Sequence, residues 1–133
     1  MPITKNSARQ DVIAAYVDFT FADAPTTATV YEALNLPAGA VVVGGDLVVT
    51  TAWNTATSAV LAIGDVTTAN RYGSAIDLKT AARTALTQTG FVTTPTQKTV
   101  NVTPTLSGTA ATAGAARLTV LYICKGRAAF SQG

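Results

Sequence analysis

The chain has 133 residues, a formal net charge of +2, 12% charged residues and 48% apolar residues, with a mean hydropathy of +0.32. This length suits one domain, and the small net charge argues against direct nucleic-acid binding. The sequence contains no apolar run of 18 residues, so it predicts no membrane-spanning helix. The first 11 residues lack the apolar core of a signal peptide. We therefore expect no membrane partner and synthesis in a cytoplasm.

Histidine is absent, which excludes Ser-His-Asp and Cys-His catalytic sites and removes the commonest zinc ligand. The single cysteine, Cys124, cannot form an internal disulfide, and its place in an apolar run predicts a small buried side chain. No glycine motif has the spacing of a phosphate-binding loop. We expect no enzyme activity, no cofactor and no metal.

The first strand signal lies in residues 12–21, where apolar and polar residues alternate. Val17 and Phe19 fall on one side of this segment, and Tyr16 and Asp18 on the other. Such a period of two predicts a half-buried β-strand.

Further short strands are predicted at 29–36 and 41–43. The pair Gly44-Gly45 then predicts a bulge, a kink or a change of sheet. Residues 45–66 predict a β-hairpin with Ala52 opposite Ser58. In that register both faces of the hairpin are apolar: Leu47 and Val49 oppose Ile63 and Leu61 on one face, and Val48 and Val60 lie on the other.

The C-terminal half continues the pattern of short strands. Residues 76–90 contain four threonines, which favours one helical turn at most or an extended edge strand. The segment 98–106 alternates, and Pro104 favours an edge position for it. The run 116–124 is apolar on both faces, which is typical of a central strand covered on two sides.

Seven to nine short strands separated by turn residues predict an all-β fold, a jelly roll or β-sandwich. We expect one domain over residues 1–133: an N-terminal arm (1–11), a sandwich (12–124) and a C-terminal tail (125–133). The arms carry Lys5 and Arg9 at one end, and Lys125 and Arg127 with the apolar Phe130 at the other. The basic residues of the tail either meet an acidic partner or are solvated.

Two clusters are candidates for chemistry. Asp46 and Asp65 would lie at the same open end of the hairpin, as a carboxylate pair for glycoside cleavage or cation binding, or as strand-end residues that satisfy turn amides. The turn interpretation is favoured because neither residue has further acidic neighbours in sequence.

The second cluster is centred on Trp53 and Asn54 at the hairpin tip, with Asn70, Arg71 and Tyr72 in a nearby loop. These residues could form a sugar-binding platform. Alternatively, Trp53 packs on the end of the sandwich or anchors a subunit interface, which is the favoured interpretation.

A longer pattern runs through residues 12–123: Leu36-Pro37-Ala38-Gly39-Ala40 before a strand, Trp53-Asn54 before Thr57-Ser58-Ala59, then Ile63-Gly64-Asp65 and Arg71-Tyr72. It resembles the small head-decoration, or cement, proteins of tailed bacteriophages. These are strand and turn patterns and carry no catalytic signature.

The resemblance implies a jelly-roll sandwich that forms dimers or trimers on the outer capsid surface and bridges major capsid subunits. The second face of the hairpin would then meet a sister subunit or the capsid. A glycan-binding module of a phage tail or fibre remains the alternative. The residues taken as candidate interface positions are Lys5, Arg9, Val48, Trp53, Val60, Arg71, Tyr72, Lys125, Arg127 and Phe130.

Overall fold

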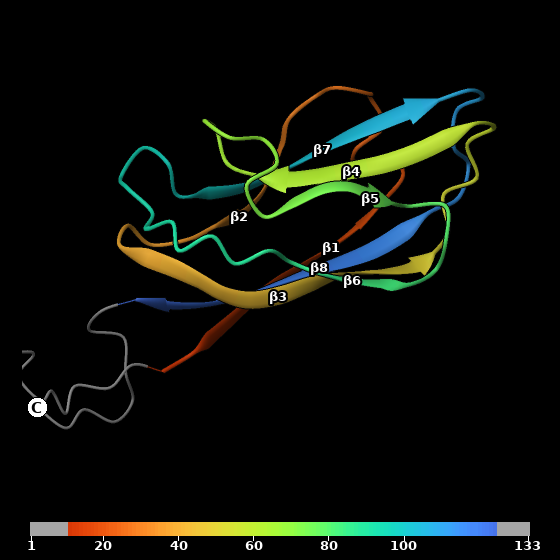
Figure 1. The fold of residues 1–133 in the computed structure, drawn as a ribbon. Helices are drawn as coiled ribbons and strands as arrows, with labels where there is room; N and C mark the ends of the chain where they lie inside the picture. Colours follow the sequence, from red (N-terminus) through yellow and green to blue (C-terminus); the bar gives the residue numbers. More distant parts are fainter. Residues whose placement is uncertain (1–10, 125–133) are drawn as a thin grey trace, which may run out of the picture.

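The computed structural model describes residues 11–124, which form eight β-strands and no helix, so no helix in this part of the chain could cross a membrane. The strands are β1 (Ile13–Thr20), β2 (Tyr31–Asn35), β3 (Ala40–Thr51), β4 (Ser58–Gly64), β5 (Gly73–Asp77), β6 (Arg83–Ala85), β7 (Thr99–Ser107) and β8 (Ala115–Cys124). They build two packed layers (Figure 1). Sheet A has the strand order β1-β8-β3-β6, and sheet B has the order β2-β7-β4-β5.

The strand order is that of a jelly roll. The chain pairs β1 with β8, β2 with β7, β3 with β6 and β4 with β5, all antiparallel, as if one long hairpin had been rolled up. Rolling brings β8 beside β3 and β7 beside β4, which completes the two four-stranded sheets. The expectation of an all-β jelly-roll sandwich is therefore confirmed.

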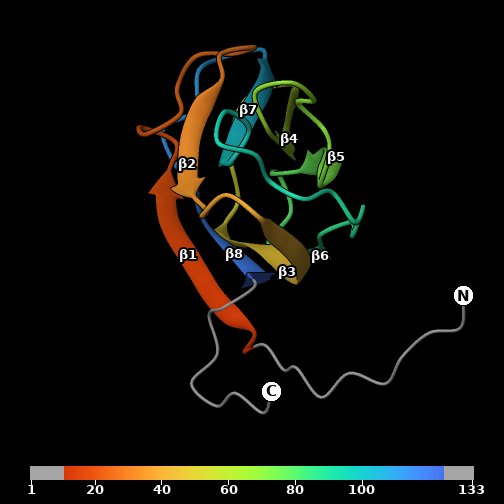
Figure 2. The same cartoon turned by 90° about the vertical axis from the view of Figure 1, so that its left-hand side faces the viewer.

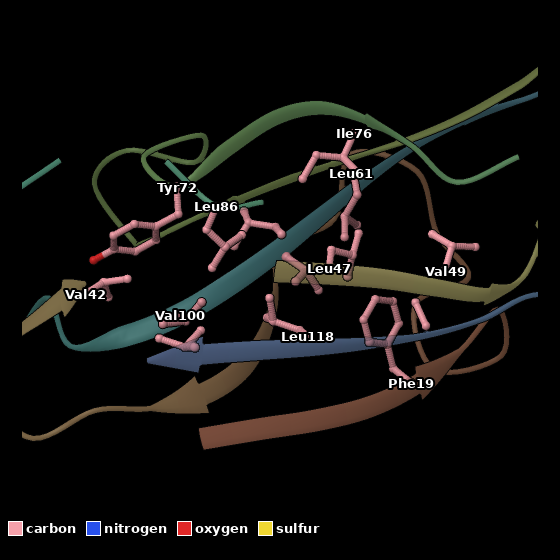
Figure 3. Close-up of a cluster of buried hydrophobic side chains, with 14 of the residues drawn as sticks. Phe19, Val42, Leu47, Val49, Leu61, Tyr72, Ile76, Leu86, Val100 and Leu118 are labelled. Atoms are coloured by element: carbon pink, nitrogen blue, oxygen red, sulfur yellow. The ribbon is translucent and has the colours of Figure 1, made fainter. Parts of the chain in front are cut away.

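The core lies between the sheets and is filled by the inward face of each strand (Figure 3). The alternation expected for β1 is confirmed, since Phe19 is buried while Tyr16 and Asp18 are exposed. Burying an aliphatic side chain stabilises the fold by about 1.5–3 kcal/mol. The largest side chains that are almost fully buried are those of Leu47, Leu61, Ile63, Leu78, Val100, Pro104, Leu118 and Val120.

β3 is one strand of 12 residues rather than two short ones. The register with β8 shifts between Val42 and Gly44, which confirms the predicted bulge. A Cβ atom on Gly45 would lie 2.3 Å from the carbonyl oxygen of Thr119, so only glycine fits this close approach. The bulge lets both Val42 and Leu47 face the core, five positions apart, although strict alternation would place them on opposite faces.

The predicted hairpin over 45–66 is wrong. β3 belongs to sheet A and β4 to sheet B, and the residues between them cross from one layer to the other. Ala52 and Ser58 are therefore not paired. Two apolar runs joined by a short polar turn fit a hairpin and a crossing between layers equally well, because the local pattern does not say which sheet the second strand joins.

Pro104 is not at a sheet edge, so the edge position predicted for residues 98–106 is wrong. It lies in β7 between β2 and β4, with Leu61 opposite it. Its carbonyl oxygen accepts a hydrogen bond from the amide of Ala28, which lies before β2 begins, so its backbone faces a side where the β2 ladder has ended. A missing amide proton costs no ladder hydrogen bond at such a position. Residues 76–90, in contrast, are extended as expected, and β5 and β6 are both edge strands.

Candidate interaction surfaces

Trp53 is buried inside its own sandwich, with 3% of its surface exposed. Its indole ring packs on Phe19, with 6.0 Å between ring centroids, and on the backbone of Gly114. The ring therefore has no free face on which a sugar could stack. The prediction that Trp53 anchors a subunit interface is not tested, and the surface proposed below does not include this residue.

The amide of Asn54 is used up by the loop before β8. Its Oδ1 accepts hydrogen bonds from the backbone amides of Thr112 (2.7 Å) and Ala113 (3.1 Å), and its Nδ2 donates to the Thr112 hydroxyl (2.7 Å). These contacts fasten the small-residue loop over the tryptophan end of the sandwich. Both lone pairs of Oδ1 and one of the two Nδ2 protons are therefore engaged, which leaves a single donor of the Asn54 side chain for a ligand.

Arg71 and Tyr72 lie at the other end of β4. Tyr72 is 2% exposed, and its backbone amide donates to the carbonyl of Ile63. Trp53 precedes β4 and Tyr72 packs against its last residues, so a strand of seven residues, roughly 20 Å, separates them. In Figure 3 Tyr72 and Phe19, the partner of Trp53, lie at opposite ends of the core. The structure therefore contradicts the combined sugar-binding platform.

Asp65 organises the turn that follows β4. Its Oδ1 accepts from the backbone amides of Thr67 (2.9 Å) and Thr68 (2.7 Å), and its Oδ2 accepts from Arg71 Nε at 2.5 Å. The Arg71 guanidinium also lies 3.7 Å above the ring centroid of Phe91. Burial alone would raise the pKa of Asp65, but the Thr68 amide, Arg71 and the Thr67 amide together outweigh burial and lower it. Asp65 is a charged turn residue held in place on all sides.

Asp46 and Asp65 do not form a carboxylate pair. Asp46 lies in the middle of β3 on sheet A, where its Oδ2 accepts from Arg83 Nε at 2.6 Å, whereas Asp65 follows a strand of sheet B. Each carboxylate is neutralised by its own arginine. No cluster of three potential metal ligands occurs in residues 11–124. The turn interpretation fits Asp65 and is wrong for Asp46.

Val48 and Val60 do not share a surface. In β3 the neighbours Leu47 and Val49 are buried, so Val48 faces outward from sheet A. In β4 the neighbours Ala59 and Leu61 are buried, so Val60 faces outward from sheet B. The two valines lie on opposite sides of the molecule, which corrects the single apolar hairpin face expected from the sequence.

The outer face of sheet A carries a row of paired charges. Arg117 of β8 donates to both carboxylate oxygens of Asp18 in β1, at 2.7 and 3.0 Å, and lies 4.7 Å from the ring centroid of Tyr16. Arg83 and Asp46 form a second pair across β6 and β3. Val48 lies between the two pairs, because its register partners are Arg117 and Arg83. Positive and negative charges on this row balance.

An apolar area continues the same face towards the start of β1 and the end of β8. Tyr16 is 61% exposed, and Val12 is also exposed. The half-buried residues Val41, Leu121 and Ile123 lie beside them, since Ile123 is the register partner of Val41. We call this area, together with the charged row, the outer face of sheet A. The sequence pattern of 116–124 indicated an apolar outward side of β8, but the neighbours on β1 and β3 depend on strand register, which the local sequence does not give.

One cavity opens at an end of the described sandwich, and another opens at its side. The larger, about 480 Å³, lies at the tryptophan end and is lined by Phe21, Pro25, Leu106 and Ala111 among others. The smaller, about 270 Å³, lies between β1 and β2. The candidate residues Lys5, Arg9, Lys125, Arg127 and Phe130 lie outside the described residues.

Comparisons with known proteins give three informative likenesses. The chain matches no family model, and no curated protein matches it by sequence. It is similar to a chain in the capsid asymmetric unit of cyanophage Pam1, at 25% identity over 93% of this chain and 91% of that chain, with a TM-score of 0.63. It is also similar to a chain in the capsid of Ralstonia phage GP4, at 22% identity over 93% and 90%, with a TM-score of 0.68.

A third similar chain comes from the acid-stable capsid of the Helicobacter pylori bacteriophage KHP30, at 21% identity over 87% and 92%, with a TM-score of 0.60. In all three cases the covered shares of the two chains are nearly equal, so each matched chain is about as long as this one. The likeness therefore spans a whole small chain. This protein has the β-sandwich fold of chains found in three phage capsids.

Proposed function

We propose that this chain is a structural protein of a phage virion that decorates the outer surface of the capsid and cements it by bridging major capsid subunits. The observation that carries the proposal is the match at 25% identity, over nearly the whole of both chains, to a chain of the Pam1 capsid. The cementing part rests in addition on the resemblance of residues 12–123 to head-decoration proteins.

The chemistry of the described residues supports a role in contact rather than in turnover. The two aspartates considered for catalysis are each paired with an arginine. Of the residues considered for sugar binding, Trp53 is buried against Phe19, and Asn54 is hydrogen-bonded to the loop before β8. The described residues therefore do not form the sugar-binding platform on which the glycan-binding alternative rests. A cementing protein needs only surface area that symmetry repeats, and many weak copies act together by avidity.

The outer face of sheet A is the surface that we assign to the capsid. It combines exposed apolar side chains with paired charges that leave no net charge to repel a partner. The basic arm residues Lys5, Arg9, Lys125 and Arg127 would add contacts to acidic groups on the major capsid protein, and Phe130 would fill an apolar gap there.

The test uses the phage whose genome encodes this chain. Mass spectrometry and electron cryomicroscopy of purified virions should find the chain on the outside of the shell. Deletion of the gene should give capsids that release DNA at lower temperature, and added purified protein should restore the wild-type release temperature. Absence of the chain from virions, or density only in the tail, would overturn the proposal.

The face is tested by a matched pair of variants. Val48→Asp places a charge on the outer face of sheet A, and Val60→Asp places the same charge at a half-buried position on the outer face of sheet B. We expect Val48→Asp to weaken co-sedimentation with capsids lacking the protein, and Val60→Asp to bind as the wild type does. The reverse result would assign the contact to sheet B, and deletion of 126–133 tests the tail separately.

A further inference from the structure

The four sheet edges of this sandwich are not equivalent. β6 has only three residues, β5 contains a register shift and Ala75 with a φ of +51°, and β2 contains a register shift between Glu32 and Leu34. Short strands, bulges and irregular backbone are the devices that prevent an edge from pairing with another chain. β1 has none of them: its eight residues pair with β8 without a shift and include neither proline nor glycine.

The hydrogen bonds around the end of β1 show which of its backbone groups face outward. The backbone amide of Phe21 donates to the carbonyl of Gly114, so the backbone N–H and C=O groups of odd-numbered residues face β8. The backbone groups of even-numbered residues face away from β8. Thr20 shows this directly, since its backbone amide donates to the Asp23 carboxylate and its carbonyl accepts from the Asp23 amide. Within β1, Ala14, Tyr16 and Asp18 are left with outward amides and carbonyls, and no other strand of residues 11–124 pairs there. Figure 2 shows β1 along the outer margin of sheet A.

We propose that β1 of a second copy of this chain pairs with this edge, antiparallel about a two-fold axis through Tyr16. Tyr16 then lies opposite the partner's Tyr16, and Ala14 lies opposite the partner's Asp18. Each of these pairs exchanges two hydrogen bonds, so every outward amide and carbonyl of the edge is satisfied. The two copies of sheet A become one continuous sheet of eight strands.

The edge is self-complementary in charge. In the Tyr16 register each Asp18 faces an alanine and keeps its own Arg117 partner. An axis through Asp18 would place two carboxylates directly opposite each other, which is unfavourable. Because β1 is the only regular edge within residues 11–124 and the two-fold pairing uses it on both copies, the pairing closes as a dimer and does not continue into a filament.

The cavity between β1 and β2 supplies a second reason for a strand at this position. Its volume is about 270 Å³. Its apolar lining includes Val17 and Phe19 of β1 and Tyr31 and Ala33 of β2, and the carboxylates of Asp18, Asp23 and Glu32 also line it. It lies on the side of the sandwich where these two edge strands face each other. A strand added beside β1 covers this gap and removes apolar lining from water.

The first test is a proline placed where it removes only an outward amide. Ala14→Pro loses no bond to β8, because its amide points away from that strand, and the exposed alanine contributes little packing. We expect the wild type to sediment as a dimer and Ala14→Pro to raise the dissociation constant at least tenfold with unchanged β-sheet circular dichroism. A monomeric wild type, or a proline variant that dimerises as the wild type does, would overturn the proposal.

The matched control distinguishes the edge from the face. Thr119 is the register partner of Tyr16 and shares the outer face of sheet A, but it lies one strand further in. Thr119→Lys should leave the dimer intact, whereas a dimer broken by Thr119→Lys and not by Ala14→Pro would place the interface on the face.

A second measurement uses the unmodified protein. The amide protons of Ala14, Tyr16 and Asp18 should exchange slowly at concentrations where the dimer forms and quickly on dilution. Fast exchange of all three in a sample that is dimeric by light scattering would refute the pairing. Both tests use the purified chain alone, so the inference stands or falls independently of the capsid proposal.

Discussion

Asp65→Asn is the substitution whose cost the structure defines best. The Asp65 side chain is 2% exposed and accepts hydrogen bonds from two backbone amides and from Arg71. Asparagine keeps the shape and one acceptor oxygen but loses the negative charge. Arg71 is then left without its counter-ion in a site from which water is mostly excluded.

The expected cost follows from the burial of both partners. Removing one member of a fully buried ion pair costs about 3–5 kcal/mol. Arg71 remains 18% exposed and keeps its contacts with Phe91 and the Thr68 hydroxyl, so part of this cost is avoided. We expect the free energy of unfolding to fall by about 2–3 kcal/mol, which for a chain of this size lowers the melting temperature by roughly 6–15 °C.

Thermal unfolding followed by circular dichroism measures this effect, and Asp46→Asn is the control. Asp46 also pairs with an arginine, but the side chains of Arg83 and Asp46 are 62% and 23% exposed. Such a pair contributes about 0.2–1 kcal/mol, so the control should lower the melting temperature by less than about 5 °C. Equal losses in the two variants would refute the argument from burial.

Three further predictions concern the same fold. Because the pKa of Asp65 is lowered in the native state, its carboxylate stabilises the fold above the ordinary pKa of 3.8, and this stability is lost as the pH falls through the lower native pKa. Asp65→Asn should therefore show a smaller fall in the urea midpoint of unfolding between neutral and acid pH than the wild type. Equal falls in the two proteins would contradict this. Gly114→Ala would place a Cβ atom 2.5 Å from the Trp53 ring and should cost about 1–3 kcal/mol and shift the tryptophan emission, whereas Gly90→Ala, which meets no atom within 4 Å, should leave the emission unchanged. The thiol of Cys124 is buried and should react with a disulfide reagent only on unfolding, so rapid labelling of the native protein would show that the end of β8 opens.

The sequence was informative where the signal is local. Alternation placed β1 and its faces, the Gly44-Gly45 pair marked the bulge, and the apolar run 116–124 marked a central strand. It failed where the answer depends on which strands become neighbours. The pairing of Asp18 with Arg117 joins residues far apart in the chain, and no local pattern reports a register.

The errors have the same origin. The run from Leu47 to Ile63 contains two good strands, but their membership in opposite sheets is decided by β8 and β7, which come later in the chain. Pro104 suggested an edge strand because proline has no amide proton to donate to a neighbouring strand. In the structure no such bond is lost, because the β2 ladder ends before it reaches Pro104. Trp53 is not among the errors: the favoured interpretation placed it against the end of the sandwich, and its ring is buried there against Phe19.

The position of β8 has a consequence for how the protein is made. β8 separates β1 from β3 in sheet A, yet of the strands in residues 11–124 it is the last to leave the ribosome. Until it emerges, β1 has no partner strand within residues 11–124, and sheet A cannot close over the core. Pairing between distant segments makes folding slow, so the nascent chain must stay soluble with its longest regular edge unpaired. Premature termination before residue 115 would therefore leave sheet A with only the short pairing of β3 with β6, rather than yield a shortened sandwich.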